Sequence, residues 1–176
     1  EADGAGLRMA EALGAQVVQT LASPAALCPV SRVVWPDGAT GVFPHIIERG
    51  KPGVIGVLAS GARFCNEGLG YHDYVTAMQA AVPDGEPAAS WLICDHRFLR
   101  RYGLGIVRPA PVPFGGWLRS GYLKRGRTVA ELARACGIDP AGLERVRRLR
   151  GQHGKEAVSD RQQRLVRAFA RHRDLD

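Results

Sequence analysis

Apolar residues recur at helical spacing near the start of the chain. The residues on this face are Leu7, Ala10, Leu13, Val17 and Leu21. The pattern is opened by Gly4-Ala5-Gly6 and stops before Ser23-Pro24, a pair that favours a loop. We therefore predict one amphipathic helix that fills most of this segment.

Strand-like runs follow at 30–35 (VSRVVW) and 42–47 (VFPHII). In the next stretch, Ser60-Gly61 separates two apolar runs by the two residues of a tight hairpin turn. We therefore expect 54–59 and 62–66 to pair antiparallel. This hairpin would place Asn66 and Glu67 at the end of its second strand.

Helical spacing returns at 71–81, where Tyr71, Tyr74, Val75 and Met78 share one face. The run ASWLICD at 89–95 predicts a buried strand, and Asp95 is placed to cap a short helix at 96–102. Residues 103–116 are dense in glycine and proline, which predicts a loop.

Capping signals mark the last helices. Thr128 and Glu131 form a capping box and Gly137 a C-cap, while Asp139-Pro140 is an N-cap followed by a proline at the first helical position. Two short helices should therefore meet at a tight turn. Ser159 and Gln162 suggest a further basic helix to about residue 172. Strands followed by helices favour an α+β fold with a small mixed sheet and flanking helices.

Charge is distributed unevenly along the 176 residues. The net charge is +7, and residues 145–176 supply +6 of it. Four cysteines lack any paired metal-ligand spacing, which favours buried reduced thiols in a cytoplasmic protein. The sequence contains no apolar run long enough to span a bilayer, and it shows no signal-peptide pattern.

The stretch RFCNEGLGYHDY at 63–74 carries the candidate chemistry. An amide and a carboxylate beside glycines, as in Asn66 and Glu67, can hold a loop in place or line a substrate pocket. Tyr71 can be a core residue, or it can exchange a proton with a substrate. In FPHII, His45 is a candidate substrate contact as well as a candidate core residue. Arg49 and Lys51 flank a glycine, and we expect them to be solvated surface charges.

Several segments resemble the FAD-dependent fumarate reductase and succinate dehydrogenase flavoprotein superfamily, in particular its 3-ketosteroid Δ1-dehydrogenase-like branch. They are GAGLRMAEALGA, ERGKPGVIGVLASGARFCNE, Tyr71 and GRTVAELARACGIDPAGL. The run from Gly61 to Glu67 followed by Tyr71 is the most specific element. The resemblance covers roughly residues 1–146.

The resemblance implies that residues 1–22 close an FAD-binding domain and that 23–146 form the substrate or cap domain, followed by a basic tail at 147–176. It implies that Tyr71 removes a proton beside the carbonyl of a hydrophobic ketone, such as a 3-ketosteroid, while hydride passes to the flavin. Gly4 and Gly6 would contact FAD. Here Ala5 replaces the aspartate that the family has between these glycines, and Asp3 lies just upstream.

Two further departures limit the resemblance. No arginine occurs between Arg63 and Arg97, where fumarate reductases would carry their proton donor, so dicarboxylate chemistry is not expected. The G-x-G-x-x-G motif that cradles the FAD pyrophosphate is absent from the sequence. We therefore expect a cap fragment that is inactive without the FAD-binding domain of its parent protein.

Two other classes of protein remain open. The helix pair at 128–150 also resembles a DNA-binding helix-turn-helix, but the early positions of the second helix include Glu144 and lack an arginine or amide. The second class is a non-catalytic interaction module, in which an exposed apolar face mediates formation of a homodimer.

Overall fold

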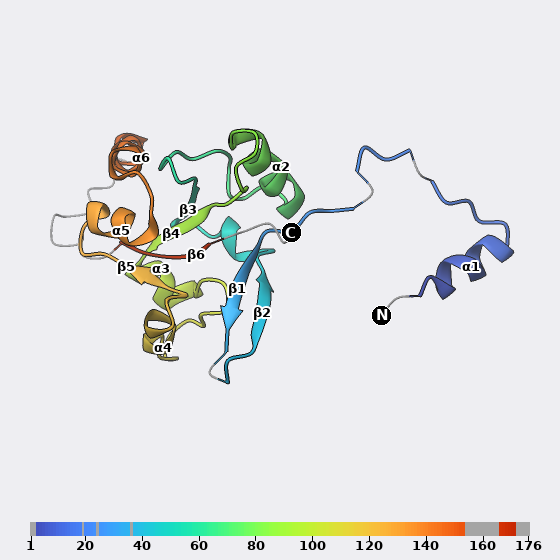
Figure 1. The fold of residues 1–176 in the computed structure, drawn as a ribbon, viewed down its shortest axis with the longest axis horizontal. Helices are drawn as coiled ribbons and strands as arrows, with labels where there is room; N and C mark the ends of the chain where they lie inside the picture. Colours follow the sequence, from blue (N-terminus) through green and yellow to red (C-terminus); the bar gives the residue numbers. More distant parts are fainter. Residues whose placement is uncertain (1–2, 19, 24, 36, 154–165, 172–176) are drawn as a thin grey trace.

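The computed structural model describes residues 3–18, 20–23, 25–35, 37–153 and 166–171 (Figure 1). Most of them form one body of two sheets and flanking helices. Helix α1 (Ala5–Ala12) lies well apart from this body, and none of its residues is buried. The α+β class is confirmed at the level of helices combined with small sheets.

Helix α1 is shorter than the apolar pattern predicts. It ends at Ala12 because Gly14 adopts a positive φ of 88° and closes the helix. The Gly14 N–H donates to the Glu11 carbonyl and the Ala15 N–H to the Ala10 carbonyl, at 2.9 and 3.0 Å. These two bonds are the Schellman arrangement that ends a helix at a glycine. The predicted extension toward Leu21 is therefore wrong.

Strands β1 (Val30–Val34) and β2 (Thr40–Pro44) form a two-stranded antiparallel sheet. Their register pairs Val30 with Pro44 and Val34 with Thr40. Both strands are predicted by the sequence, although β2 starts and ends earlier than 42–47. The 3-10 helix η1 (Glu48–Gly50) follows them directly.

The second sheet has the order β3-β4-β6-β5, formed by Val54–Val57, Trp91–Asp95, Val166–Arg171 and Lys124–Arg125. Its three pairings are all antiparallel, so the described strands do not form the mixed sheet that we expected. The hairpin prediction is also wrong in its second half. The turn forms, with the Leu58 N–H donating to the Ala62 carbonyl at 3.0 Å, but β3 pairs with β4.

The C-terminal strand β6 corrects the prediction of a basic helix to residue 172. Its residues 166–171 lie between β4 and β5, where they complete the second edge of β4. Strand β4, which has three consecutive buried residues, is thereby paired on both edges, with β3 and with β6. The proposed caps of the helix, Ser159 and Gln162, lie outside the described residues.

Helix α2 (Tyr71–Ala81) has the predicted bounds. Helix α3 (His96–Tyr102) begins at the predicted cap, since the Phe98 N–H donates to Asp95 Oδ1 at 2.7 Å. The Gly/Pro-rich loop leads into the short helix α4 (Gly115–Arg119). Helices α5 (Val129–Cys136) and α6 (Pro140–His153) meet at the predicted turn, where Gly137 has a φ of 72°.

The hydrophobic core lies between the second sheet and helices α2, α3, α5 and α6. Its most deeply buried side chains include Val57, Tyr74, Leu92, Leu99 and Leu132. Gly56 is required inside this core, because a Cβ there would lie 2.5 Å from the Tyr74 hydroxyl. The Tyr74 ring thereby packs directly over β3, and this contact positions α2 against the sheet.

Candidate active site

Tyr71 and Tyr74 lie on the same helix in opposite environments. Tyr71 opens α2 directly after its N-cap residue Gly70, and 38% of its surface is exposed. Tyr74 is fully buried, its hydroxyl lies 2.9 Å from Ser90 Oγ, and burial raises its pKa. The reachable phenol of this stretch is therefore Tyr71.

Asn66 and Glu67 shape the loop that leads to Tyr71. Exposed Asn66 forms a turn, because its Oδ1 accepts from the Gly68 N–H at 3.0 Å and its carbonyl from the Leu69 N–H at 3.1 Å. Glu67 is buried, and its Oε1 accepts from the Gly56 N–H at 2.8 Å. Arg63 donates to both oxygens of the same carboxylate, at 2.9 and 2.5 Å. Glu67 thus ties the loop to β3.

His45 lies in a buried chain of hydrogen bonds. It is fully enclosed, its Nδ1 contacts Glu48 Oε1, and its Nε2 lies 2.8 Å from Ser31 Oγ. The Ser31 hydroxyl in turn lies 2.8 Å from the Tyr122 hydroxyl. Burial would raise the pKa of Glu48, but the hydrogen bond and charge of His45 outweigh it, so that pKa is lowered. This chain ties η1 to β1 and to the segment before β5.

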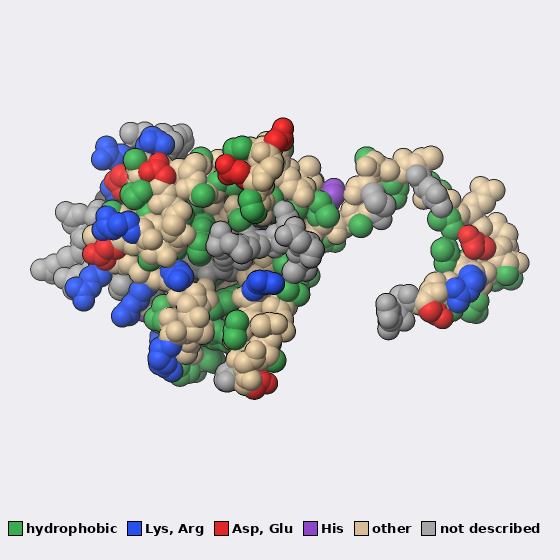
Figure 2. All heavy atoms as spheres, in the orientation of Figure 1, with side chains coloured by type: hydrophobic (Ala, Val, Ile, Leu, Met, Phe, Trp, Pro, Cys, Tyr) green, Lys and Arg blue, Asp and Glu red, His purple; other side chains and the backbone are tan. Residues whose placement is uncertain are grey.

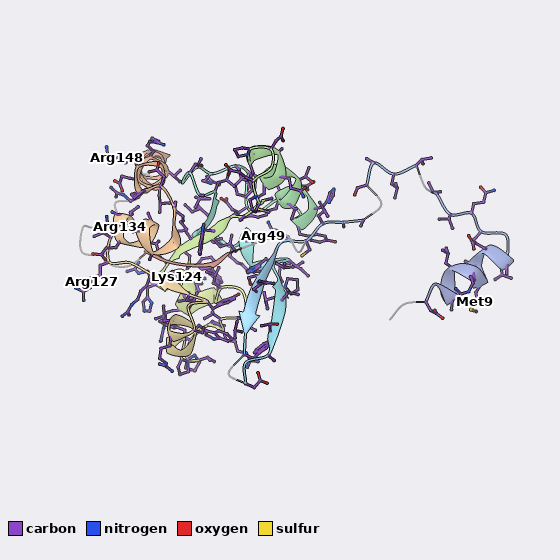
Figure 3. The ribbon with its side chains drawn as sticks, in the orientation of Figure 1. Met9, Arg49, Lys124, Arg127, Arg134 and Arg148 are labelled. Atoms are coloured by element: carbon purple, nitrogen blue, oxygen red, sulfur yellow. The ribbon has the colours of Figure 1, made fainter. Side chains whose placement is uncertain are left out.

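Arg49 is a residue whose position the sequence does not predict. We expected a solvated charge, but its side chain is 1% exposed. Its guanidinium donates to the backbone carbonyls of His45 and Glu67, at 3.1 and 3.2 Å, and lies over the Tyr74 ring at 4.4 Å. Figure 3 shows Arg49 inside the body, near the place where β1, β3 and α2 approach one another. No periodic pattern around ERG in the sequence indicates this burial.

The structure brings two of the predicted site residues together at Arg49, because its guanidinium donates to the backbone carbonyls of both His45 and Glu67. Tyr71 follows Glu67 by four residues, at the start of α2. Gly4 and Gly6 are not part of this cluster, because α1 lies far from it (Figure 1).

The first turn of α6 packs against the rest of the body. The Asp139 N–H donates to the Ala59 carbonyl at 2.7 Å, and Leu143 is 3% exposed. Basic side chains do gather over α5 and α6 (Figure 2), and Figure 3 labels Arg134 and Arg148 among them. The first turn of a DNA-reading helix must enter the groove, so this packing opposes the helix-turn-helix alternative.

The four cysteines, all of them among the described residues, form no disulfide. Cys94 and Cys136 are buried, and Cys28 and Cys65 are half-buried. Burial raises the pKa of Cys65 to about 11. The described part of the chain contains no group of metal-ligating side chains and no helix that is long and apolar enough to cross a bilayer.

A family model described as an FAD binding domain matches residues 1–172. The chain therefore belongs to this family of FAD-binding flavoproteins. One curated relative, the 4-oxocyclohex-2-ene-1-carboxylate 5-dehydrogenase of Sinomonas cyclohexanicum, is 37% identical over 135 residues, which cover 77% of this chain and 23% of that protein. The 3-oxosteroid 1-dehydrogenase of Mycobacterium tuberculosis is 35% identical over 96 residues, or 52% of this chain and 17% of that protein.

Solved structures agree with this family. The 3-ketosteroid delta1-dehydrogenase from Sterolibacterium denitrificans, in complex with 1,4-androstadiene-3,17-dione, matches with a TM-score of 0.63 and 30% identity. The match covers 85% of this chain and 26% of that one. A flavocytochrome c3 fumarate reductase shares the fold, with a TM-score of 0.53, 17% identity and coverage of 83% and 24%. The chain spans about a quarter or less of the length of these relatives.

The residues around α1 fit a limited contact with FAD. Gly4 has a φ of 77° before the first turn, and a Cβ on Gly6 would meet no atom within 4 Å, so the backbone here is open to a close partner. A helix N-terminus also favours an anionic group. The Asp3 carboxylate occupies one of its donors, because Oδ1 accepts from the Ala5 N–H at 2.9 Å. With no G-x-G-x-x-G in the sequence, these residues alone do not form a complete binding site for this cofactor.

Proposed function

We propose that this chain forms the substrate-binding cap of an FAD-dependent dehydrogenase, and that Tyr71 is the base that acts on a hydrophobic cyclic ketone. The observation that carries the proposal is the contrast between exposed Tyr71 and buried Tyr74 on one turn of α2. A phenol that exchanges a proton with a substrate must be reachable and must be held at a fixed point.

The surroundings of Tyr71 suit an apolar substrate. Leu69 is 47% exposed two residues before it, and Ile46 and Ile47 are 49% and 75% exposed beside η1. These segments are neighbours, because the Cα of Gly68 lies 3.7 Å from the position of a Cβ on Gly50. Exposed aliphatic side chains next to a reachable phenol favour a hydrocarbon ring over a dicarboxylate.

The reaction balances as a two-electron dehydrogenation. FAD, when bound, supplies the acceptor for the hydride that leaves the substrate. Tyr71, acting as its phenolate, takes the proton from the carbon beside the carbonyl, and the hydride leaves from the adjacent ring carbon. The electron pair of the first C–H bond becomes part of the new carbon–carbon double bond, so the ketone is oxidised to an enone.

Asn66 remains a candidate substrate contact, because its side chain is exposed at the turn before Tyr71. The sequence also favours substrate contacts for Glu67 and His45. We assign both to supporting roles instead, because the Glu67 carboxylate is bonded to Arg63 and Gly56 and His45 is fully enclosed. Their work is to hold the loops on which the substrate-facing residues lie.

The names of the relatives suggest the class of substrate. They act on a 3-oxosteroid and on a 4-oxocyclohexene carboxylate, both cyclic ketones. We propose the same class for the protein of which this chain is a part. The choice between a steroid and a single ring depends on the depth of the complete pocket.

The proposed partner is the FAD-binding part of the same parent protein. On α1 and just beyond it, the apolar side chains of Leu7, Met9 and Leu13 are 51%, 70% and 90% exposed, so the described residues leave them uncovered. Gly4 and Gly6 would meet FAD where this helix docks. Self-association of the isolated chain through the same apolar side chains is the competing outcome. Size-exclusion chromatography with light scattering distinguishes a self-associated chain from a monomer that awaits its FAD-binding partner.

The test compares this chain with its full-length parent. We expect only the parent to bind FAD, seen as a yellow visible spectrum, and to reduce an artificial electron acceptor with a 3-ketosteroid or 4-oxocyclohex-2-ene-1-carboxylate. Tyr71→Phe should leave only a small residual turnover and an unchanged flavin spectrum. Tyr102→Phe, at a half-buried tyrosine on α3, is the matched control. A parent that turns over normally with Tyr71→Phe would exclude Tyr71 as the base.

A further inference from the structure

Arg49 is a buried cation held almost entirely by backbone. Besides the His45 and Glu67 carbonyls, its Nη2 donates to the Ile46 carbonyl at 3.4 Å. Burying a guanidinium costs free energy unless its donors are satisfied. Three carbonyls from two separate segments accept from its Nε, Nη1 and Nη2, so the side chain fixes the distance between those segments.

The two segments carry the residues that we propose to face the substrate. Residues 45–50 carry exposed Ile46 and Ile47, and residues 66–71 carry Asn66 and Tyr71. Arg49 donates to backbone carbonyls of both segments. A change in its position therefore changes how these residues lie relative to one another.

Arg49 also contacts the chain on both sides of Tyr71. On one side it binds the carbonyl of Glu67, and on the other its guanidinium lies 4.4 Å from the centre of the Tyr74 ring. Tyr71 lies between these two anchors, at the first turn of α2. A planar guanidinium can donate in several directions and stack on a ring at once, which a lysine ammonium cannot do.

The charge of Arg49 is not used in an ion pair among the described residues. The nearby carboxylate of Glu67 is bonded to Arg63 and to the Gly56 N–H, and that of Glu48 to His45. The Glu48–His45–Ser31 chain also fixes the turn on which Arg49 lies. The contacts of Arg49 therefore indicate that it holds the backbone of two segments in place, while the hydrogen-bonded chain through His45 holds the turn that carries Arg49.

We propose that Arg49 is a positioning residue, which holds the segment from Glu67 to the first turn of α2 at Tyr74 so that the Tyr71 phenol is aligned with the substrate. This inference rests on the proposed function of Tyr71 as the base. Arg49 touches neither substrate nor cofactor in this role. It acts through the backbone of Glu67 and the ring of Tyr74.

The test uses the full-length flavoprotein loaded with FAD and the same two ketones. Misplacing a reacting group by about 1 Å costs roughly 100-fold in rate. We therefore expect Arg49→Met to lower kcat by about 100-fold, with little change in KM and an unchanged flavin spectrum. Arg49→Lys should recover part of this loss. Arg32→Met, at an exposed arginine on β1, is the control and should leave kcat as it is.

A double-variant cycle separates positioning from general damage. If Arg49 acts through Tyr71, Arg49→Met should slow the Tyr71→Phe protein no further. Additive losses, or an Arg49→Met protein with normal kcat, overturn the inference while Tyr71 keeps its role. Normal turnover by Tyr71→Phe overturns the proposed base and with it this inference. If Arg49→Met does not accumulate as a folded flavoprotein, Arg49→Lys takes its place in the same cycle.

Discussion

Replacing Gly56 by alanine tests how tightly the core fixes α2 against the sheet. The new Cβ would lie 2.5 Å from the Tyr74 hydroxyl and 3.1 and 3.2 Å from two ring carbons. Tyr74 cannot move aside easily. Its ring is fully buried, with Arg49 over it and Phe64 packed edge-on at a centroid distance of 5.0 Å.

The expected cost has two parts. Forcing an extra carbon into a packed core costs about 1–3 kcal/mol. Displacing the Tyr74 hydroxyl from Ser90, which is itself fully buried, costs about 1 kcal/mol more. Gly56→Ala should therefore lower the free energy of unfolding by about 2–4 kcal/mol. Because the Gly56 N–H also donates to Glu67, the same shift disturbs the loop of Tyr71.

Urea unfolding followed by circular dichroism measures this loss. Gly116→Ala is the matched control, because a Cβ at Gly116 on α4 would meet nothing within 4 Å. It should be neutral or stabilising by up to about 1 kcal/mol. Removing the clashing hydroxyl in Gly56→Ala/Tyr74→Phe should restore part of the stability, since the closest contact disappears. Unchanged stability of Gly56→Ala would show that this contact is not tight.

Two predictions concern ionisable groups. The lowered pKa of Glu48 means that this carboxylate binds a proton less tightly in the folded protein than in the unfolded chain. Glu48 therefore contributes to stability above its ordinary pKa of 4.5, and this contribution is lost as the pH falls through the lowered pKa. Melting temperatures of Glu48→Gln and the unchanged protein should therefore converge in acid, and a constant difference at every pH would refute this. Burial raises the pKa of Cys65 from 9.0 to about 11, so its alkylation by iodoacetamide near pH 8 should be about 100-fold slower than after unfolding. Mass spectrometry follows the labelling of Cys65, and equal rates in the folded and unfolded chain would contradict this prediction.

Local signals in the sequence predicted much of the secondary structure. The period of 71–81, the Asp95 cap and the Thr128 cap all mark helix starts that the structure has. The failures involve long-range pairing. Residues 62–66 follow a good hairpin turn, but the β3 N–H of Gly56 is taken by the Glu67 side chain and β3 pairs with β4 instead.

The candidate site divides in the same way. The sequence indicates Tyr71 and the Asn66-Glu67 pair, because their residue types and their order resemble a known family. It does not separate exposed Tyr71 from buried Tyr74, since both lie on the same helical stripe. It also misassigns Arg49, because burial of a charge depends on carbonyls that the fold brings to it from elsewhere in the chain.

The sequence by itself determined the family, the α+β class and the helix boundaries that rest on caps, because these depend on residues close together in the chain. Only the tertiary structure decided the strand partners, the pairing of residues 166–171 in β6 and the buried network around Arg49. Hydrogen bonds in these features join residues far apart in sequence, and each donor takes the acceptor that the completed core places nearest to it. The alignment proposed for Tyr71 depends on this second kind of contact.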